Sequence, residues 1–179
     1  MKLPSLLLSA LFLCAHMTYA QPTTPAKKPE VPKSKWFSGG KGFEEAVALQ
    51  KETGANMLLY FFYYGDDSQK GLCSWWEKRG LQDGQVNKYL RTFIKVKVEL
   101  PMNKKEEELF AAFRVNKTPA VFIVTPDDRY PTRCQVFDYV NKRPTLKTAE
   151  ELIEMFTKAA APVLTTDQKE NPDATTPRP

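Results

Sequence analysis

The sequence predicts a single α/β domain with a central mixed sheet of about four strands flanked by helices. Stretches with helical spacing of apolar residues alternate with short apolar runs typical of buried strands, over roughly residues 41–163. The last two runs flank a proline-containing turn, which predicts a closing antiparallel hairpin. A chain of 179 residues is long enough to bury a core of this kind.

The first half of the domain is expected to run helix, strand, helix. Apolar residues recur at helical spacing from Phe43 to Thr53, and Gly54 ends that helix. The continuous apolar run 56–64, "NMLLYFFYY", predicts a strand buried on both faces. A polar loop over 65–70 then leads to a helix that we expect to begin near Cys73.

The middle of the domain adds a short helix, a strand and another helix. Asp83 is a suitable cap for a helix that ends near Leu90. Residues 92–100, "TFIKVKVEL", alternate apolar and charged side chains, which predicts a strand with one wetter face. Asn103 and Glu106 then form a capping-box pattern at the start of the next helix.

The last part is expected to form a hairpin followed by a helix. Pro119 precedes a predicted strand over 120–124, and residues 132–140 are expected to return as its partner. Thr148 and Glu151 form a second capping-box pattern before the final helix.

Segments outside the domain are expected to be processed or unstructured. A basic start, the apolar run Leu6–Cys14 and a cleavage site after Ala20 predict a signal peptide over 1–20. Residues 21–40 are rich in Pro and Lys and are expected to be a flexible linker; residues 164–179 resemble a disordered tail. We therefore expect an exported protein, periplasmic or extracellular because the ending "TPRP" is no retention signal, with no membrane segment after signal removal.

The few cysteines and the single histidine limit the kinds of catalytic and metal site that we expect. Removal of the signal peptide would also remove Cys14 and the single histidine, His16, and would leave Cys73 and Cys134 as the cysteines. Catalysis by Cys-His or Ser-His pairs and a structural zinc site are therefore not expected, and we predict no metal and no cofactor. The net charge of +5 comes largely from lysines of the linker, so a nucleic-acid partner is not expected.

Four features together resemble the thioredoxin superfamily. They are the strand "MLLYFFYY", the helix expected at Cys73, the strand "FIKVKVEL", and "KTPAVFIV", in which Pro119 matches the family's cis-proline. The resemblance covers about 41–160 and is greatest to exported thioredoxin-like and disulfide-isomerase-like domains. It implies a thioredoxin-like fold and a cis bond between Thr118 and Pro119.

The motif of this family is degenerate here, because the first cysteine position of C-x-x-C is Lys70 and only Cys73 remains. A dithiol cycle needs two thiols within bonding reach. Two interpretations of Cys73 stay open. A helix N-terminus and the Lys70 charge would lower its pKa and make it a working monothiol, whereas burial would make it inert.

Cys134 is not expected to replace the missing thiol. We place it early on the returning strand, at the opposite end from Pro119, and predict no bond between Cys73 and Cys134. Cys134 is then a small buried strand residue.

Candidate binding residues surround Cys73. The resemblance implies that extended peptides dock beside Pro119 through the open backbone of Thr118. Trp75 and Trp76 are neighbours on a helix, so we expect one to be core and the other partly exposed near that surface.

Three functions remain open from the sequence. The first is an exported protein that binds protein or peptide clients near Cys73 and Pro119, with at most monothiol redox activity and mixed disulfides. The second is a monothiol disulfide oxidoreductase or isomerase that uses Cys73, and the third is a non-redox structural domain. Whether the protein is an enzyme, and its oligomeric state, are not determined by the sequence.

Overall fold

The computed structural model describes residues 30–100, 103–127 and 131–161. The expected signal peptide (1–20) and tail (164–179) lie outside the described residues, as does the first part of the expected linker. The folded region begins before residue 41, where we expected it to start, because residues 36–38 already pair with the central sheet.

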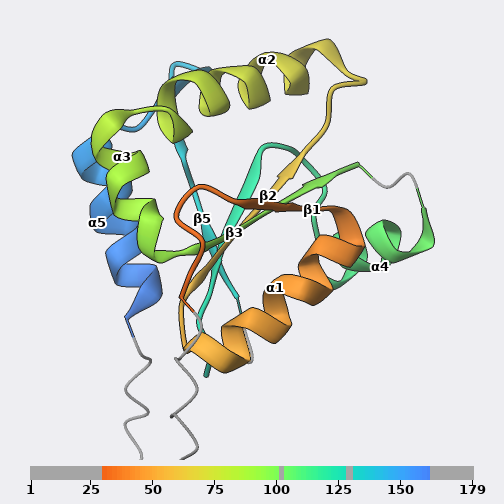
Figure 1. Cartoon of the computed structure of the whole chain (residues 1–179). Coiled ribbons are helices and arrows are strands. Elements are labelled where there is room, and N and C mark those ends of the chain that lie inside the picture. Colours follow the sequence, from red (N-terminus) through yellow and green to blue (C-terminus); the bar gives the residue numbers. More distant parts are fainter. Residues whose placement is uncertain (1–29, 101–102, 128–130, 162–179) are drawn as a thin grey trace, which may run out of the picture.

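The central sheet is mixed and has five strands in the order β1-β3-β2-β4-β5 (Figure 1). Its strands are β1 (Trp36–Ser38), β2 (Met57–Phe62), β3 (Ile94–Glu99), β4 (Ala120–Val124) and β5 (Thr132–Cys134). β1 and β2 run parallel to β3, whereas β4 is antiparallel to β2 and to β5. The expected fold class is therefore confirmed, and the strand of this sheet that the sequence analysis missed is β1.

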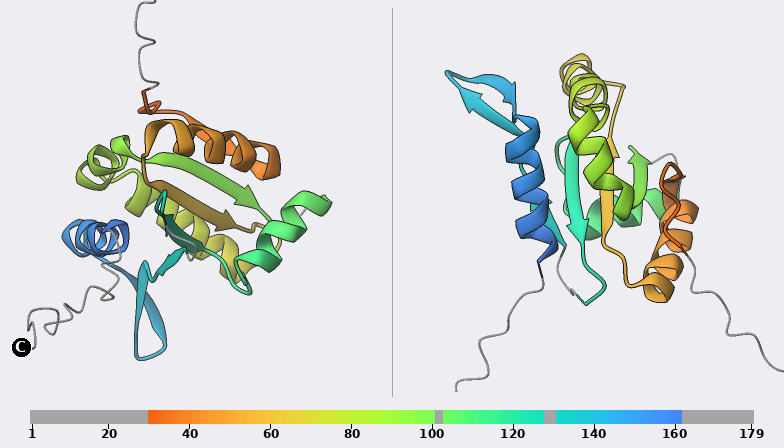
Figure 2. Two further views of the ribbon diagram at one scale, coloured as in Figure 1. Left: turned by 90° about the horizontal axis from the view of Figure 1, so that it is seen from below. Right: turned by 60° about the vertical axis from the view of Figure 1, so that its left-hand side comes forward.

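Helices cover both faces of this sheet (Figure 2). The α-helices are α1 (Gly39–Thr53), α2 (Asp67–Trp75), α3 (Gly84–Tyr89), α4 (Lys104–Ala112) and α5 (Ala149–Ala160). A π-helical turn, η1 (Trp76–Leu81), continues α2, and a 3-10 turn, η2 (Leu90–Thr92), follows α3. Helices α1 and α4 pack on one face, and α2, α3 and α5 pack on the other. None of the helices in the described ranges combines the length and apolar character needed to cross a bilayer.

Strand β2 lies at the centre of two core clusters because all six of its residues are buried. Successive side chains of a strand point to opposite faces. Leu58, Tyr60 and Phe62 therefore pack toward α2, α3 and α5, and the intervening residues pack toward α1 and α4. The aromatic run of the sequence becomes a strand with no exposed face.

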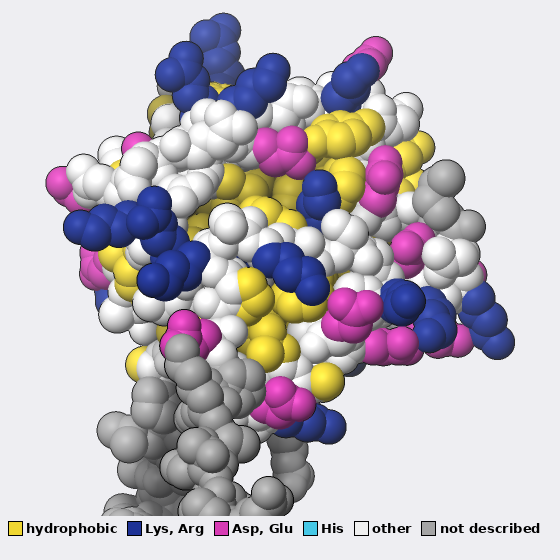
Figure 3. Space-filling model, viewed as in Figure 1, with side chains coloured by type: hydrophobic (Ala, Val, Ile, Leu, Met, Phe, Trp, Pro, Cys, Tyr) yellow, Lys and Arg dark blue, Asp and Glu magenta, His cyan; other side chains and the backbone are white. Residues whose placement is uncertain are grey.

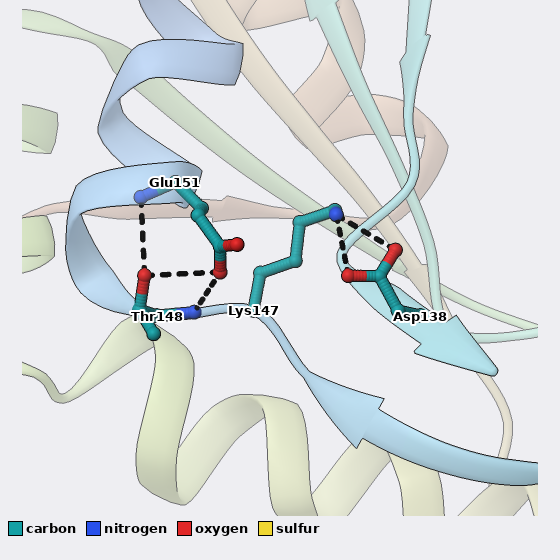
Figure 4. Close-up of polar contacts among 4 residues, drawn as sticks. All are labelled: Asp138, Lys147, Thr148 and Glu151. Carbon is teal, nitrogen blue, oxygen red and sulfur yellow. Dashed lines mark hydrogen bonds and ion pairs between the residues drawn. The ribbon is translucent and has the colours of Figure 1, made fainter. Parts of the chain in front are cut away.

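The last helix begins with the predicted capping box (Figure 4). The Glu151 N–H donates to the Thr148 hydroxyl at 3.3 Å, and the Thr148 N–H donates to Glu151 Oε2 at 2.8 Å. Next to it, Lys147 Nζ lies 2.7 Å from the Asp138 carboxylate. This ion pair ties the preceding hairpin to the start of α5.

The predicted return strand 132–140 is wrong as a single element. Only β5 joins the central sheet; β6 (Phe137–Val140) instead pairs with β7 (Arg143–Leu146) in a separate two-stranded sheet. Figure 2 shows this hairpin projecting from the body of the domain. Its tip, Asn141 and Lys142, adopts positive φ angles of 50° and 64°, the turn geometry that a tight hairpin requires.

Candidate functional site

Helix α2 begins at Asp67 and not near Cys73, so the expected helix start is wrong. The Asp66 carboxylate accepts a hydrogen bond from the Gln69 N–H at 3.0 Å and caps the helix. A short acidic side chain is a good N-cap, and this one lies a full turn and more before Cys73. Cys73 therefore lies near the C-terminal end of α2 and not at the helix N-terminus, where it was expected.

Cys73 is completely buried, with 0% of its surface exposed. Its thiol lies beside the hydroxyl of Tyr60, and it packs in the same core cluster as Trp76. Burial, together with the neighbouring Cys73 and Glu77, raises the pKa of Tyr60 far above its usual value. Reagents and partner proteins would reach this sulfur only after α2 moves.

A carboxylate that the sequence analysis missed, Glu77, contacts the same Tyr60 hydroxyl that lies beside this thiol. Glu77 Oε2 accepts a hydrogen bond of 2.6 Å from the Tyr64 hydroxyl, and Glu77 Oε1 accepts one of 3.2 Å from Tyr60. Burial and then this hydrogen bond raise the pKa of Tyr64. The spacing of Glu77, four residues after Cys73, could have indicated one helix face.

Lys70 occupies an exposed position on α2, whereas Cys73 is buried beneath the same helix. The two side chains therefore lie in different environments, one in solvent and one in the core. This placement gives no support to a role for Lys70 in tuning the thiol.

The Thr118–Pro119 peptide bond is cis. The backbone of Thr118 is nevertheless not open, as we expected, because Gln69 from α2 covers it. The Gln69 carboxamide oxygen accepts hydrogen bonds from the Thr118 N–H at 3.0 Å and from the Thr118 hydroxyl at 2.9 Å. Thr118 is consequently only 5% exposed.

A groove of about 530 Å³ lies beside Pro119. We call it the Pro119 groove; its walls are the start of α2, the loop before β4, and the segment from β5 into β6. On the hairpin side it is lined by Phe137 and by Tyr139, which is 59% exposed. A groove with one exposed aromatic side chain, that of Tyr139, and buried thiols is suited to noncovalent contact.

The two tryptophans divide as predicted. Trp76 is 0% exposed and packs against Phe156 of α5, so it belongs to the core. Trp75 is 37% exposed, and its ring centroid lies 5.5 Å from that of Phe137. Trp75 thus supports a wall of the Pro119 groove, while Trp76 cannot contact a ligand there.

Cys134 does not lie at the opposite end from Pro119, as we expected. It pairs with Val121, two residues after Pro119, because β5 is short and its chain then turns toward the hairpin. Cys134 lines the Pro119 groove but is only 4% exposed, and burial raises the pKa of its thiol to about 12. Both Cys73 and Cys134 are free thiols.

A metal site in a protein is built from clustered His, Cys, Asp and Glu side chains. Within the ranges that the structure describes, no three such residues come together in a way that could hold a metal ion.

Solved structures of similar architecture include thioredoxins and Dsb-type proteins. A thioredoxin from Thermus thermophilus matches with a TM-score of 0.51 and 20% identity over 70% of this chain and 86% of that one. The C-terminal domain of Neisseria meningitidis DsbD in the oxidised form matches with a TM-score of 0.49 and 18% identity. The match covers 70% of this chain and 99% of that one. A disulphide isomerase from Xylella fastidiosa matches with a TM-score of 0.47 and 22% identity, over 66% of this chain and 88% of that one.

Sequence comparisons add nothing to this likeness, since neither the models of protein families nor the sequences of curated proteins give a match. At 20% identity the likeness to the Thermus thioredoxin establishes the fold alone.

Proposed function

We propose that this protein, which has a thioredoxin-superfamily fold, is exported and binds an extended peptide segment of a client protein in the Pro119 groove without forming a disulfide. The observation that carries the proposal is the combination of an open, aromatic-walled groove with a thiol that is 0% exposed.

The buried thiol argues against covalent capture. A thiolate must reach the sulfur of its partner to exchange a disulfide. Cys73 is on the buried face of α2, and Lys70 occupies the position that would carry the attacking thiol. A monothiol exchanger that uses Cys73 therefore requires α2 to open, and we rank it second.

The Thr118 N–H lies at the groove and is a hydrogen-bond donor whose acceptor could be exchanged. It already donates to Gln69, so a client carbonyl would replace the present acceptor of this N–H with another. Gln69 is a side chain at the first turn of α2 and can rotate away more readily than a strand can move. Client binding is thus expected to compete with the Gln69 contact.

The test selects binders from a displayed library of random linear peptides and measures the affinity of one labelled binder. Binding should survive Cys73→Ala, rise several-fold in Gln69→Ala, and fall about tenfold or more in Tyr139→Ala. Val140→Ala is the matched control, because Val140 is also 59% exposed on the same strand but does not line the groove.

Two results would contradict this function. Equal losses in Tyr139→Ala and Val140→Ala would show that the groove is not the contact surface. Loss of binding in Cys73→Ala, with a mixed disulfide to cysteine-containing peptides, would favour the monothiol alternative.

The export part of the proposal rests on residues 1–20. A reporter enzyme that is active only after export, fused after residue 40, should be active with these residues and inactive when they are deleted. Retained activity without them would refute the signal peptide.

A further inference from the structure

A second cavity, of about 680 Å³, lies on the sheet face between the strands and the segments η1, α3 and η2. It shares no lining residue with the Pro119 groove. Figure 3 shows hydrophobic side chains in a hollow below the uppermost helix, with charged side chains around it. Its volume is in the usual range for a small-molecule site. We call it the β3 cavity, because Lys95, Lys97 and Glu99 of β3 line it.

One part of the β3 cavity is apolar. Trp36 of β1, Phe62 of β2, and Leu81 and Leu90 from the segments that follow α2 line this part. Aromatic and aliphatic walls of this kind stabilise the apolar body of a ligand by removing its surface from water.

The other part of the cavity is cationic. Lys33, Arg91, Lys95 and Lys97 line it, against the two carboxylates of Glu77 and Glu99. Glu77 already accepts hydrogen bonds from two tyrosine hydroxyls. Across the described part of the chain, the four cations form no ion pair with a carboxylate.

Lys95 makes this arrangement unusual, because it is only 6% exposed. Its ammonium group donates a hydrogen bond to the backbone carbonyl of Lys33, which carries no charge. Burial, and then the positive charge of Arg91, lower the pKa of Lys95. A buried cation without a nearby counter-charge is costly, so an anion bound beside it would relieve that cost.

We infer that the β3 cavity binds a small amphipathic carboxylate, with its apolar body against Trp36 and Phe62 and its carboxylate against Lys95 and Arg91. An aliphatic or aromatic acid fits both parts of the cavity, whereas a neutral or cationic analogue would leave Lys95 uncompensated. This site is independent of peptide binding in the Pro119 groove.

The experiment uses two fluorescent probes that share an aromatic body. Anilinonaphthalene sulfonate is anionic and phenylnaphthylamine is neutral, so their affinities for the full folded protein isolate the contribution of charge. The anionic probe should bind at least about tenfold more tightly. Decanoate should displace it, and decanol should displace it more weakly.

Variants locate the site. Lys95→Met keeps the length of the side chain but removes its charge, and should weaken binding of the anionic probe about tenfold while leaving the neutral probe unchanged. Arg91→Gln, at an exposed position, should also weaken binding of the anionic probe. If Lys95→Met does not fold, the affinity of Arg91→Gln for this probe tests the inference. Lys51→Gln is the control, because Lys51 is an exposed lysine that does not line the cavity.

Each alternative result would overturn the inference. Equal affinity for the two probes, or equal effects of Arg91→Gln and Lys51→Gln, would show that the cations do not select an anion. Failure of decanoate to displace the probe would exclude the carboxylate class. Absence of binding by either probe would exclude the site.

Discussion

The Gln69 carboxamide oxygen accepts two hydrogen bonds from Thr118, one from its backbone N–H and one from its hydroxyl, at 3.0 and 2.9 Å. This contact joins α2 to the residue before the cis-proline and occupies the backbone donor that a peptide would use. It therefore couples the stability of the domain to the accessibility of the Pro119 groove.

Removal of this acceptor should destabilise the domain. Gln69→Ala leaves the donors of a 5% exposed Thr118 unpaired, which should lower the free energy of unfolding by about 1–3 kcal/mol in urea denaturation. Gln69→Glu keeps an acceptor oxygen and should lose less. Gln82→Ala, at an exposed glutamine, is the control; an equal loss there would mean that the Thr118 contact contributes nothing.

Alkylation of Cys73 should be limited by unfolding. In the Cys134→Ala variant, the 0% exposed Cys73 should react with iodoacetamide at a rate that rises with urea in parallel with the opening of the domain. A peptide containing one free cysteine provides the unprotected rate. Fast labelling of Cys73 in buffer alone would instead show that α2 opens readily, and would favour the monothiol mechanism.

Stability should fall at alkaline pH because of Cys134. Burial raises the pKa of this thiol from 9.0 to about 12, so the unfolded chain loses the proton first as pH rises. The stabilising effect is complete below pH 9 and is lost as pH approaches 12. Wild type should therefore lose roughly 2–3 kcal/mol more than Cys134→Ala between about pH 9 and about pH 11. Parallel pH profiles for the two proteins would contradict this.

Glu77→Gln should lower the pKa of Tyr64 without returning it to the ordinary value. Burial is the largest cause of the raised pKa and remains in the variant, whereas the hydrogen bond to a charged acceptor and the repulsion by Glu77 are lost. Ultraviolet titration of tyrosinate measures the shift, and Tyr64→Phe identifies which transition belongs to this residue. An unchanged titration would exclude the carboxylate contact.

Two glycines near Cys73 should respond in opposite directions to alanine. A Cβ at Gly80 would overlap the ring of the buried Trp76, so Gly80→Ala should destabilise the protein by about 1–3 kcal/mol. At Gly71, within α2, a Cβ meets no atom within 4 Å, so Gly71→Ala should stabilise by about 0.5–1 kcal/mol. Urea midpoints compare the two, and equal shifts would rule out this packing of Trp76.

The amino-acid sequence by itself determined the elements whose signals are local. The apolar run that forms β2, the alternation that forms β3, and the capping box of Thr148 and Glu151 all appear where they were predicted. Each of these signals depends only on residues close together in the sequence, within one strand or one helical turn. The resemblance built on those elements gave the fold for the same reason.

Tertiary structure alone decided the properties of the site. Strand β1 is only three residues long and exists because it pairs with β3. Gln69 covers Thr118 across 49 residues of sequence, and Lys95 is buried in a cavity whose walls come from five separate segments. Such contacts depend on how distant elements pack. The sequence could name Cys73 and Thr118, but only the packing of α2 on the sheet determined that both are buried.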